Sequence, residues 1–135
     1  MAMMGARGAV AVVLLASLAI CSNLLGAPEP VSLDSPEVQS AAQFAIAEYN
    51  KASNDMFASK IVRIISARHQ LVSGTKYILQ VEVARTQCRL EHVVVLQICE
   101  LHESPQTKIC NFDVLSIPWD EEITLLKSEC AQSKK

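Results

Sequence analysis

Glycine is scarce in this chain of 135 residues, which has only four, and Gly5 and Gly8 lie close to the amino terminus. The sequence has no glycine-rich phosphate-binding loop and contains neither G-x-S-x-G nor H-E-x-x-H. Its three histidines, His69, His92 and His102, are scattered and lack the spacing of metal ligands. These absences argue against an enzyme, a metal site and a bound cofactor.

Positive charge is also in short supply, because 12 basic residues face 14 acidic ones and the formal net charge is −2. A mildly acidic surface gives no reason to expect binding to nucleic acid or to anionic membranes. The sequon N-x-Ser/Thr does not occur, so N-glycosylation is not expected. The function is therefore expected to involve neither nucleic acid nor a membrane.

The amino terminus has the composition of a secretory signal. Arg7 precedes an uninterrupted run of apolar and small residues from Ala9 to Ile20, which is too short to span a bilayer but suits the hydrophobic region of a signal peptide. The small residues Ala19 and Cys21 place the cut near Cys21/Ser22. A lipid-anchored Cys21 is the competing interpretation, but the bulky residue before it argues against a lipobox. We therefore expect a signal peptide over residues 1–21 and a secreted, extracellular domain over residues 22–135.

Four cysteines remain after such a cut: Cys88, Cys99, Cys110 and Cys130. An even number in a small secreted chain predicts two disulfides, and the sequence alone allows three pairings. Zinc is the rival reading, but the spacings of eleven, eleven and twenty residues include no short C-x₂₋₄-C pair. If all four are oxidised, no free thiol is left as a nucleophile.

The rest of the chain predicts a mobile arm, one helix and antiparallel strands. Two prolines and a glycine make residues 22–33 an extended, mobile arm. The helix runs from Pro36 to about Ala52, with Asp34 or Ser35 as its cap and an apolar face made mostly of alanine. Period-2 and apolar patterns predict strands over the ranges Ile61–His69, Thr75–Arg85, Cys110–Leu115 and Glu122–Lys127.

Two details of this prediction depend on the local pattern. Alternation in the first strand places Ile61, Ile65 and Ala67 on one face and Ile64 on the other. In the second strand, Tyr77, Leu79, Val81 and Val83 share a face. Residues 85–99 give no clear secondary structure.

Three apolar features are punctuated by glycine or proline. Gln70–Leu71–Val72–Ser73–Gly74 separates two strands and has the form of a hairpin loop. Its apolar tip needs a partner to bury it. Trp119 follows Pro118 at a second turn, which predicts an exposed residue of the type enriched at binding sites. The third feature is Leu24–Leu25–Gly26.

A fourth segment, Ser53–Asn54–Asp55, follows the helix. Asparagine is common at helix ends in the left-handed conformation, so Asn54 can be read as a helix cap.

In this order, these motifs resemble those of the secreted type 2 cystatins. The resemblance covers Leu25–Gly26, the helix run Gln43–Phe44–Ala45 to Glu48–Tyr49–Asn50, the Q-x-V-x-G loop, Pro118–Trp119 and the four cysteines. It implies an α+β fold in which a five-stranded antiparallel sheet wraps around one long helix. It also implies the disulfides Cys88–Cys99 and Cys110–Cys130.

The resemblance further implies reversible, tight, competitive inhibition of papain-like cysteine proteases such as the cathepsins. The residues that match the three-part inhibitory wedge of the family are Leu24, Leu25, Gly26, Gln70, Leu71, Val72, Ser73, Gly74, Pro118 and Trp119. Ser53, Asn54 and Asp55 match a second family site, which inhibits legumain-type asparaginyl endopeptidases. The alternative is an extracellular cystatin-fold binding protein without inhibitory activity.

The oligomeric state expected from the sequence is a monomer. The β-branched Val72 in a tight loop suggests backbone strain. Such strain would favour a domain-swapped dimer as an alternative form.

Overall fold

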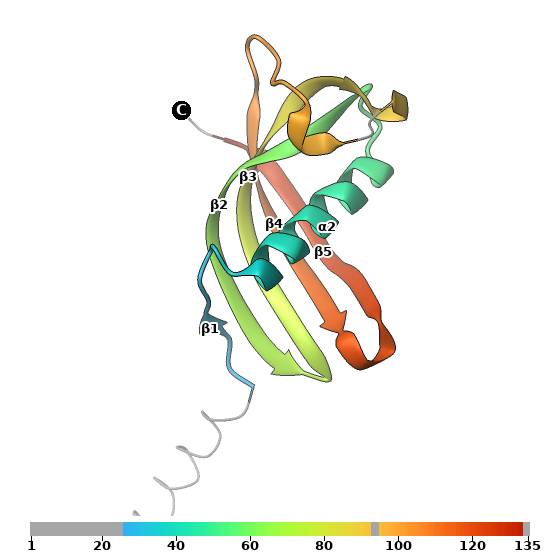
Figure 1. The fold of residues 1–135 in the computed structure, drawn as a ribbon. Helices are drawn as coiled ribbons and strands as arrows, with labels where there is room; N and C mark the ends of the chain where they lie inside the picture. The colour runs from blue at the N-terminus through green and yellow to red at the C-terminus, as the bar shows by residue number, and fades with distance from the viewer. Residues whose placement is uncertain (1–25, 93–94, 134–135) are drawn as a thin grey trace, which may run out of the picture.

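The computed structural model describes residues 26–92 and 95–133. The expected signal peptide, Leu24, Leu25 and Val93–Val94 therefore lie outside the described residues. Figure 1 shows one long helix lying across the concave face of a curved sheet. The elements in chain order are β1 (Glu29–Pro30), α2 (Pro36–Ala52), β2 (Phe57–Val72), β3 (Gly74–Arg89), β4 (Thr107–Ile117) and β5 (Glu122–Gln132).

The sheet has five strands in the order β1-β2-β3-β4-β5, and every neighbouring pair is antiparallel. Each strand is therefore paired with the strand before it and the strand after it in the chain. The helix α2 is inserted between β1 and β2. The predicted α+β architecture of one helix and a five-stranded antiparallel sheet is confirmed.

The start of α2 follows from its local sequence. Ser35 is the N-cap, and its hydroxyl accepts a hydrogen bond of 3.3 Å from the N–H of Val38, while Pro36 occupies the first turn. The helix ends as predicted at Ala52, but the next residue, Ser53, is extended. Glu121 is the only non-glycine residue with positive φ in the described ranges. The interpretation of Asn54 as a left-handed cap is therefore wrong.

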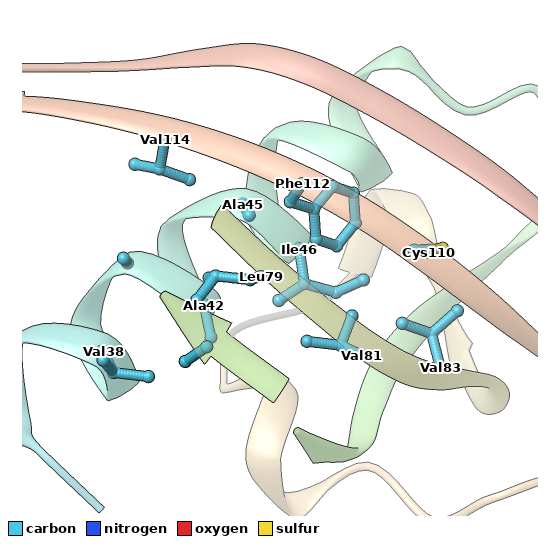
Figure 2. Packing of buried hydrophobic residues seen from close by; sticks show 12 residues of the cluster. Val38, Ala42, Ala45, Ile46, Leu79, Val81, Val83, Cys110, Phe112 and Val114 are labelled. Atoms are coloured by element: carbon cyan, nitrogen blue, oxygen red, sulfur yellow. The ribbon is translucent and has the colours of Figure 1, made fainter. Parts of the chain in front are cut away.

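No helix in the described part of the chain is long and apolar enough to cross a membrane. Instead, the apolar face of α2 is used inside the domain. Figure 2 shows it packed on β3 and β4. Its buried residues are Val38, Ala41, Ala42, Ala45 and Ile46, and those of the sheet include Leu79, Val81, Val83, Phe112 and Val114. The small alanine side chains allow the helix backbone to approach the sheet closely, as the sequence predicted.

The strand β2 departs from the predicted alternation. Its apolar residues that pack on the core are Ile61, Ile64 and Ala67, which are three residues apart. Register shifts against β3 between Ile61 and Arg63 and again between Ile64 and Ser66 explain this spacing, because each bulge reverses the side on which the following residues face. The alternation predicted for β3 is confirmed, with Leu79, Val81 and Val83 all buried.

Part of the arm expected over residues 22–33 is paired with the sheet. Glu29–Pro30 pairs with His69 and Arg68 of β2, and the N–H of Val31 donates to the oxygen of Ala67 over 3.1 Å. Pro30 is tolerated there because β1 is an edge strand.

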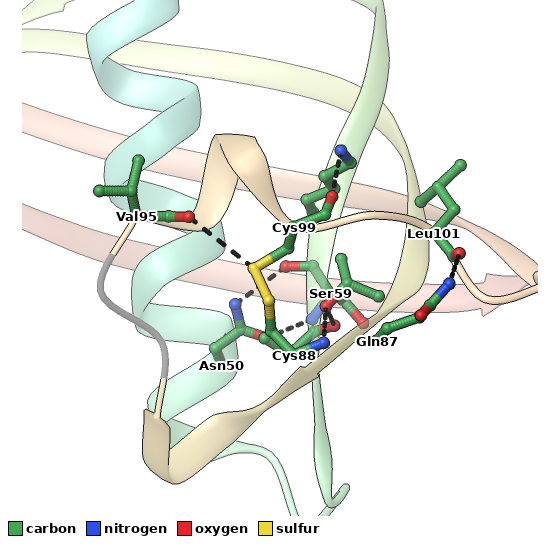
Figure 3. Close-up of a disulfide and its surroundings, with 10 residues drawn as sticks. Asn50, Ser59, Gln87, Cys88, Val95, Cys99 and Leu101 are labelled. Carbon is green, nitrogen blue, oxygen red and sulfur yellow. Dashed lines mark hydrogen bonds between the residues drawn. A yellow bond between two sulfur atoms is a disulfide. The ribbon is translucent and has the colours of Figure 1, made fainter.

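Both disulfides implied by the resemblance are present, Cys88–Cys99 and Cys110–Cys130. Residues 85–99, which the sequence left unassigned, continue β3 to Arg89 and then form short 3₁₀ turns at Leu90–His92 and Leu96–Ile98. Figure 3 shows the first disulfide beside the end of α2 and the start of β2. Closing a loop of this size stabilises a fold by about 3 kcal/mol.

The alanine face yields a test of the packing. Ala45 is fully buried whereas Ala47, on the same helix, is exposed. We expect Ala45→Leu to lower the free energy of unfolding by about 1–3 kcal/mol through overpacking. Ala47→Leu, the control, should change it little. Urea unfolding measures both, and equal effects would contradict a close helix–sheet contact.

Candidate functional site

The two hairpin tips lie at the same end of the sheet (Figure 1), and Gly26 lies close to Gln70 and Leu71 of the first tip. The pairing of β1 with β2 directs Gly26, three residues before β1, towards the tip between β2 and β3. Thr75, just after that tip, pairs with Ser116, just before the turn between β4 and β5. The antiparallel order of the strands therefore gathers segments that are far apart in the sequence.

The first hairpin carries two exposed apolar side chains at its tip. Leu71 is 72% exposed and Val72 is 50% exposed. The sequence predicted a loop of five residues, but the observed loop is shorter. Leu71 pairs with Thr75 and Val72 with Gly74, so only Ser73 lies between the strands. The ladder of β2 and β3 thus supports the apolar tip up to its last residue.

Gly74 is where the first hairpin meets the second. Its φ is +120°, and a Cβ placed there would lie 2.6 Å from the oxygen of Ser116 and 3.0 Å from Cγ1 of Ile117. Only glycine can adopt this φ and also leave room for the oxygen of Ser116 without strain. The positive φ thus falls on Gly74, and Val72, where backbone strain was expected, has no left-handed conformation. The domain-swapped dimer stays a prediction.

The second hairpin turns through a 3₁₀ turn, Pro118–Asp120, followed by Glu121 with φ of +52°. The N–H of Glu121 donates to the oxygen of Pro118 over 3.1 Å and closes the turn. Trp119 is 70% exposed, as its place beside a proline predicted. The turn therefore presents the only tryptophan of the chain to solvent.

Gly26 is joined to the first hairpin by a side-chain hydrogen bond. Nε2 of Gln70 donates to the oxygen of Gly26. The φ of Gly26 is +73°, and a Cβ there would have only ordinary contacts, the nearest at 3.7 Å from the oxygen of Leu71. Gln70 thus ties the arm to the hairpin. Gly26 and the two tips form an edge that we call the wedge, made of Gly26, Leu71, Val72 and Trp119.

Ser53, Asn54 and Asp55 are not part of the wedge. They join the end of α2 to the start of β2, whereas the wedge lies beyond the other end of β2 (Figure 1). A strand of 16 residues is roughly 50 Å long, so the two ends of β2 are far apart. The chain therefore carries two separate candidate sites.

The connection around Asn54 is held on both sides. Asn50 binds Ser59 twice, with Nδ2 donating to its oxygen over 2.9 Å and Oδ1 accepting from its N–H over 3.0 Å. The N–H of Asp55 donates to Oγ of Ser53 over 3.0 Å. Asn54 itself is exposed. The backbone is thus anchored while the amide of Asn54 faces solvent.

Asp55 is the most strongly bound residue of this connection. Its Oδ1 accepts from the N–H of Phe57 over 3.1 Å, and its Oδ2 accepts from Nε and Nη2 of Arg85 over 2.9 and 2.7 Å. Partial burial alone would raise the pKa of Asp55, but the hydrogen bond from Phe57 and the charge of Arg85 outweigh it, so its pKa lies below the ordinary value. The stabilisation from Asp55 is present above the ordinary pKa and is lost as the pH falls through the lowered one.

The chemistry available at the two ends is that of binding. Within the described ranges, no group of three or more histidine, cysteine, aspartate or glutamate side chains could hold a metal ion. The wedge is a projecting edge of apolar side chains on two paired hairpins. Such an edge is suited to enter an apolar cleft of another molecule.

The sequence analysis missed three residues that shape these ends. Ser116 supplies the oxygen against which Gly74 packs. Asn50 and Arg85 hold the connection around Asn54. Their partners are between 9 and 42 residues away in the chain, and no local pattern identifies such pairs.

Comparison with known proteins agrees with this geometry. The model of the Cystatin domain matches residues 26–119. A cystatin of Coturnix japonica is 55% identical over 112 residues, covering 81% of this chain and 96% of its own. One of Gallus gallus is 50% identical over 140 residues, covering 95% and 99%. The solved structure of dimeric human cystatin F is similar with a TM-score of 0.76 and 31% identity, covering 82% of this chain and 90% of that one.

The two glycines give a test of how the wedge is built. We expect Gly74→Ala to lower the free energy of unfolding by at least about 1 kcal/mol, because it adds strain and a clash with Ser116. Gly26→Ala, the control, meets a positive φ but no clash and lies at the end of the arm. Its effect on urea unfolding should be smaller, and equal losses would contradict the contact between the hairpins.

Proposed function

Because the chain belongs to the cystatin family, whose members inhibit cysteine proteases and are not enzymes, we propose that it is a secreted, reversible, tight-binding competitive inhibitor of papain-like proteases, the cathepsins. The arm and the two hairpin tips act together as one wedge that fills the active-site cleft. The observation that carries this proposal is the high exposure of Leu71, Val72 and Trp119 at one end of the sheet.

The energetics of the wedge support tight binding. Fully burying an exposed aliphatic side chain is favourable by about 1.5–3 kcal/mol, and Trp119 offers a larger apolar surface. Association costs less when the binding segments are already ordered. Pairing up to Val72 and the packing of Gly74 supply that order. Most of the free energy gained by burying these side chains can therefore contribute to the affinity.

Gly26 has a separate role in the proposal. Its positive φ turns the arm at the point where Gln70 binds it. The peptide bond of Gly26 is thereby directed away from the catalytic thiolate, so the inhibitor is not itself cleaved. Leu24 and Leu25, which precede it, would enter the unprimed subsites of the protease.

Titration of papain with the refolded protein lacking residues 1–21 tests the function directly. We expect stoichiometric, reversible inhibition. Gly26→Trp should weaken binding by about a hundredfold or more, because a bulky side chain would separate the arm from the cleft. Gly26→Ala is the graded control and should cost less. Absence of inhibition at micromolar concentration would leave the alternative, a cystatin-fold binding protein without inhibitory activity.

The second candidate function belongs to Asn54. We propose that Ser53–Asn54–Asp55 inhibits asparaginyl endopeptidases of the legumain type. A protease that recognises asparagine needs an accessible amide on a defined backbone. Asn54 is exposed, and hydrogen bonds to Asp55 and Asn50 hold the chain on either side of it. The distance from the wedge leaves each site free to act alone.

Substitution of Asn54 separates the two activities. We expect Asn54→Lys to abolish inhibition of legumain and to leave inhibition of papain unchanged. Asn111→Lys introduces the same change at an exposed asparagine of β4 and should alter neither. Equal inhibition of legumain by Asn54→Lys and the unsubstituted protein would exclude Asn54 as the site, whereas loss of both activities would indicate misfolding.

A further inference from the structure

Arg85 lies next to the proposed asparagine site but comes from a different part of the chain. It belongs to β3, where it pairs with Ser59 of β2, and it is 30 residues away from Asp55. Its guanidinium is half exposed, and both Nε and Nη2 point to one oxygen of Asp55. No other described residue donates a side-chain hydrogen bond to that carboxylate.

We propose that Arg85 is a positioning residue of the Asn54 site, which fixes the connection between α2 and β2 in the extended form that an asparaginyl endopeptidase binds. The inference rests on the proposed inhibition of legumain and adds to it the group that sets the shape of the site. Asp55, the residue after Asn54, is fixed by hydrogen bonds to both oxygens of its carboxylate.

The geometry of the connection explains why one arginine has this effect. Before Asn54, the helix end is tied to β2 through Asn50 and Ser59. After Asn54, the only link from the connection to β3 through a side chain is that of Arg85 with Asp55, among the contacts of the described residues. Without it, the Asp55 carboxylate keeps its hydrogen bond from the N–H of Phe57 but has no side-chain link to β3.

The frame that carries Arg85 is rigid. Thr86, the next residue, is fully buried, and its hydroxyl donates to the oxygen of Ala58 over 2.7 Å. The oxygen of Arg85 accepts from the N–H of His102 over 3.2 Å. The backbone of Arg85 is thus held by hydrogen bonds, and its side chain holds Asp55 at a fixed distance from β3. Ordering a loop before binding reduces the cost of association.

Other charged groups also face this region. A pocket beside the carboxylate is lined by Asp55, Arg85, His102 and Lys108. His102 and Lys108 make no ion pair with Asp55 in the described structure. Arg85 is therefore the cation that pairs with Asp55, and its removal takes away part of what lowers the pKa of this carboxyl, while the hydrogen bond from Phe57 remains.

The test compares Arg85→Gln, Arg85→Lys and a matched control. Arg63→Gln removes an arginine from β2 that binds Glu82 over 3.0 Å, far from Asn54 in the pairing of the sheet. We expect Arg85→Gln to weaken inhibition of legumain by roughly tenfold. Arg85→Lys should restore part of the loss because it keeps the charge. Arg63→Gln should match the unsubstituted protein, and all four proteins should inhibit papain equally.

The pH profile adds a readout that a general loss of stability would not produce. The pKa of Asp55 lies below its ordinary value in the unsubstituted protein, so inhibition should change little between about pH 6 and pH 4.5. In Arg85→Gln the carboxyl protonates at higher pH, and its inhibition should fall further over the same range. Titrations at both pH values measure the difference.

The outcomes separate this inference from the proposed function. Inhibition of legumain by the unsubstituted protein and equally by Arg85→Gln, with the same pH profile, would overturn the role of Arg85 and leave the Asn54 site intact. Failure of the unsubstituted protein to inhibit legumain would overturn both. Loss in Arg85→Gln without any recovery in Arg85→Lys, accompanied by weaker inhibition of papain, would show a structural role and also overturn the inference.

Discussion

The close contact between the alanine face of α2 and the concave side of the sheet is the constraint on which the rest of the molecule depends. Ala41, Ala42 and Ala45 have almost no exposed surface. Larger side chains at these positions would push the helix away from β3 and β4. The sheet must in turn curve around the helix, and the register shifts between β2 and β3 provide local bends.

This arrangement leaves both ends of the sheet outside the core. The helix covers the middle of the strands, so the hairpin tips project beyond it and their apolar residues stay exposed (Figure 1). Strand pairing continues into the first tip, and Gly74 packs on Ser116 of the second hairpin. The wedge is thus a rigid extension of the sheet, although it contributes little to the core.

The opposite end is organised by polar contacts instead. Asn50 joins the helix to β2, and Arg85 joins β3 to Asp55. The two ends therefore present different chemistry, an apolar edge and a polar connection with an exposed amide. Because they share only the strands between them, a substitution at one end can leave the other unchanged. This separation is the physical basis for treating the two ends as independent candidate sites.

The sequence by itself determined the features that depend on neighbouring residues. The cap at Asp34 or Ser35, the end of the helix near Ala52, the alternation of β3 and the exposure of Trp119 follow from local propensity and pattern. The bulges of β2, the one-residue turn at Ser73 and the pairing of Asp55 with Arg85 were decided only by the tertiary structure. Each of these depends on the curvature of the sheet or on contacts between residues distant in the chain. A local sequence pattern specifies neither the curvature nor the contacts.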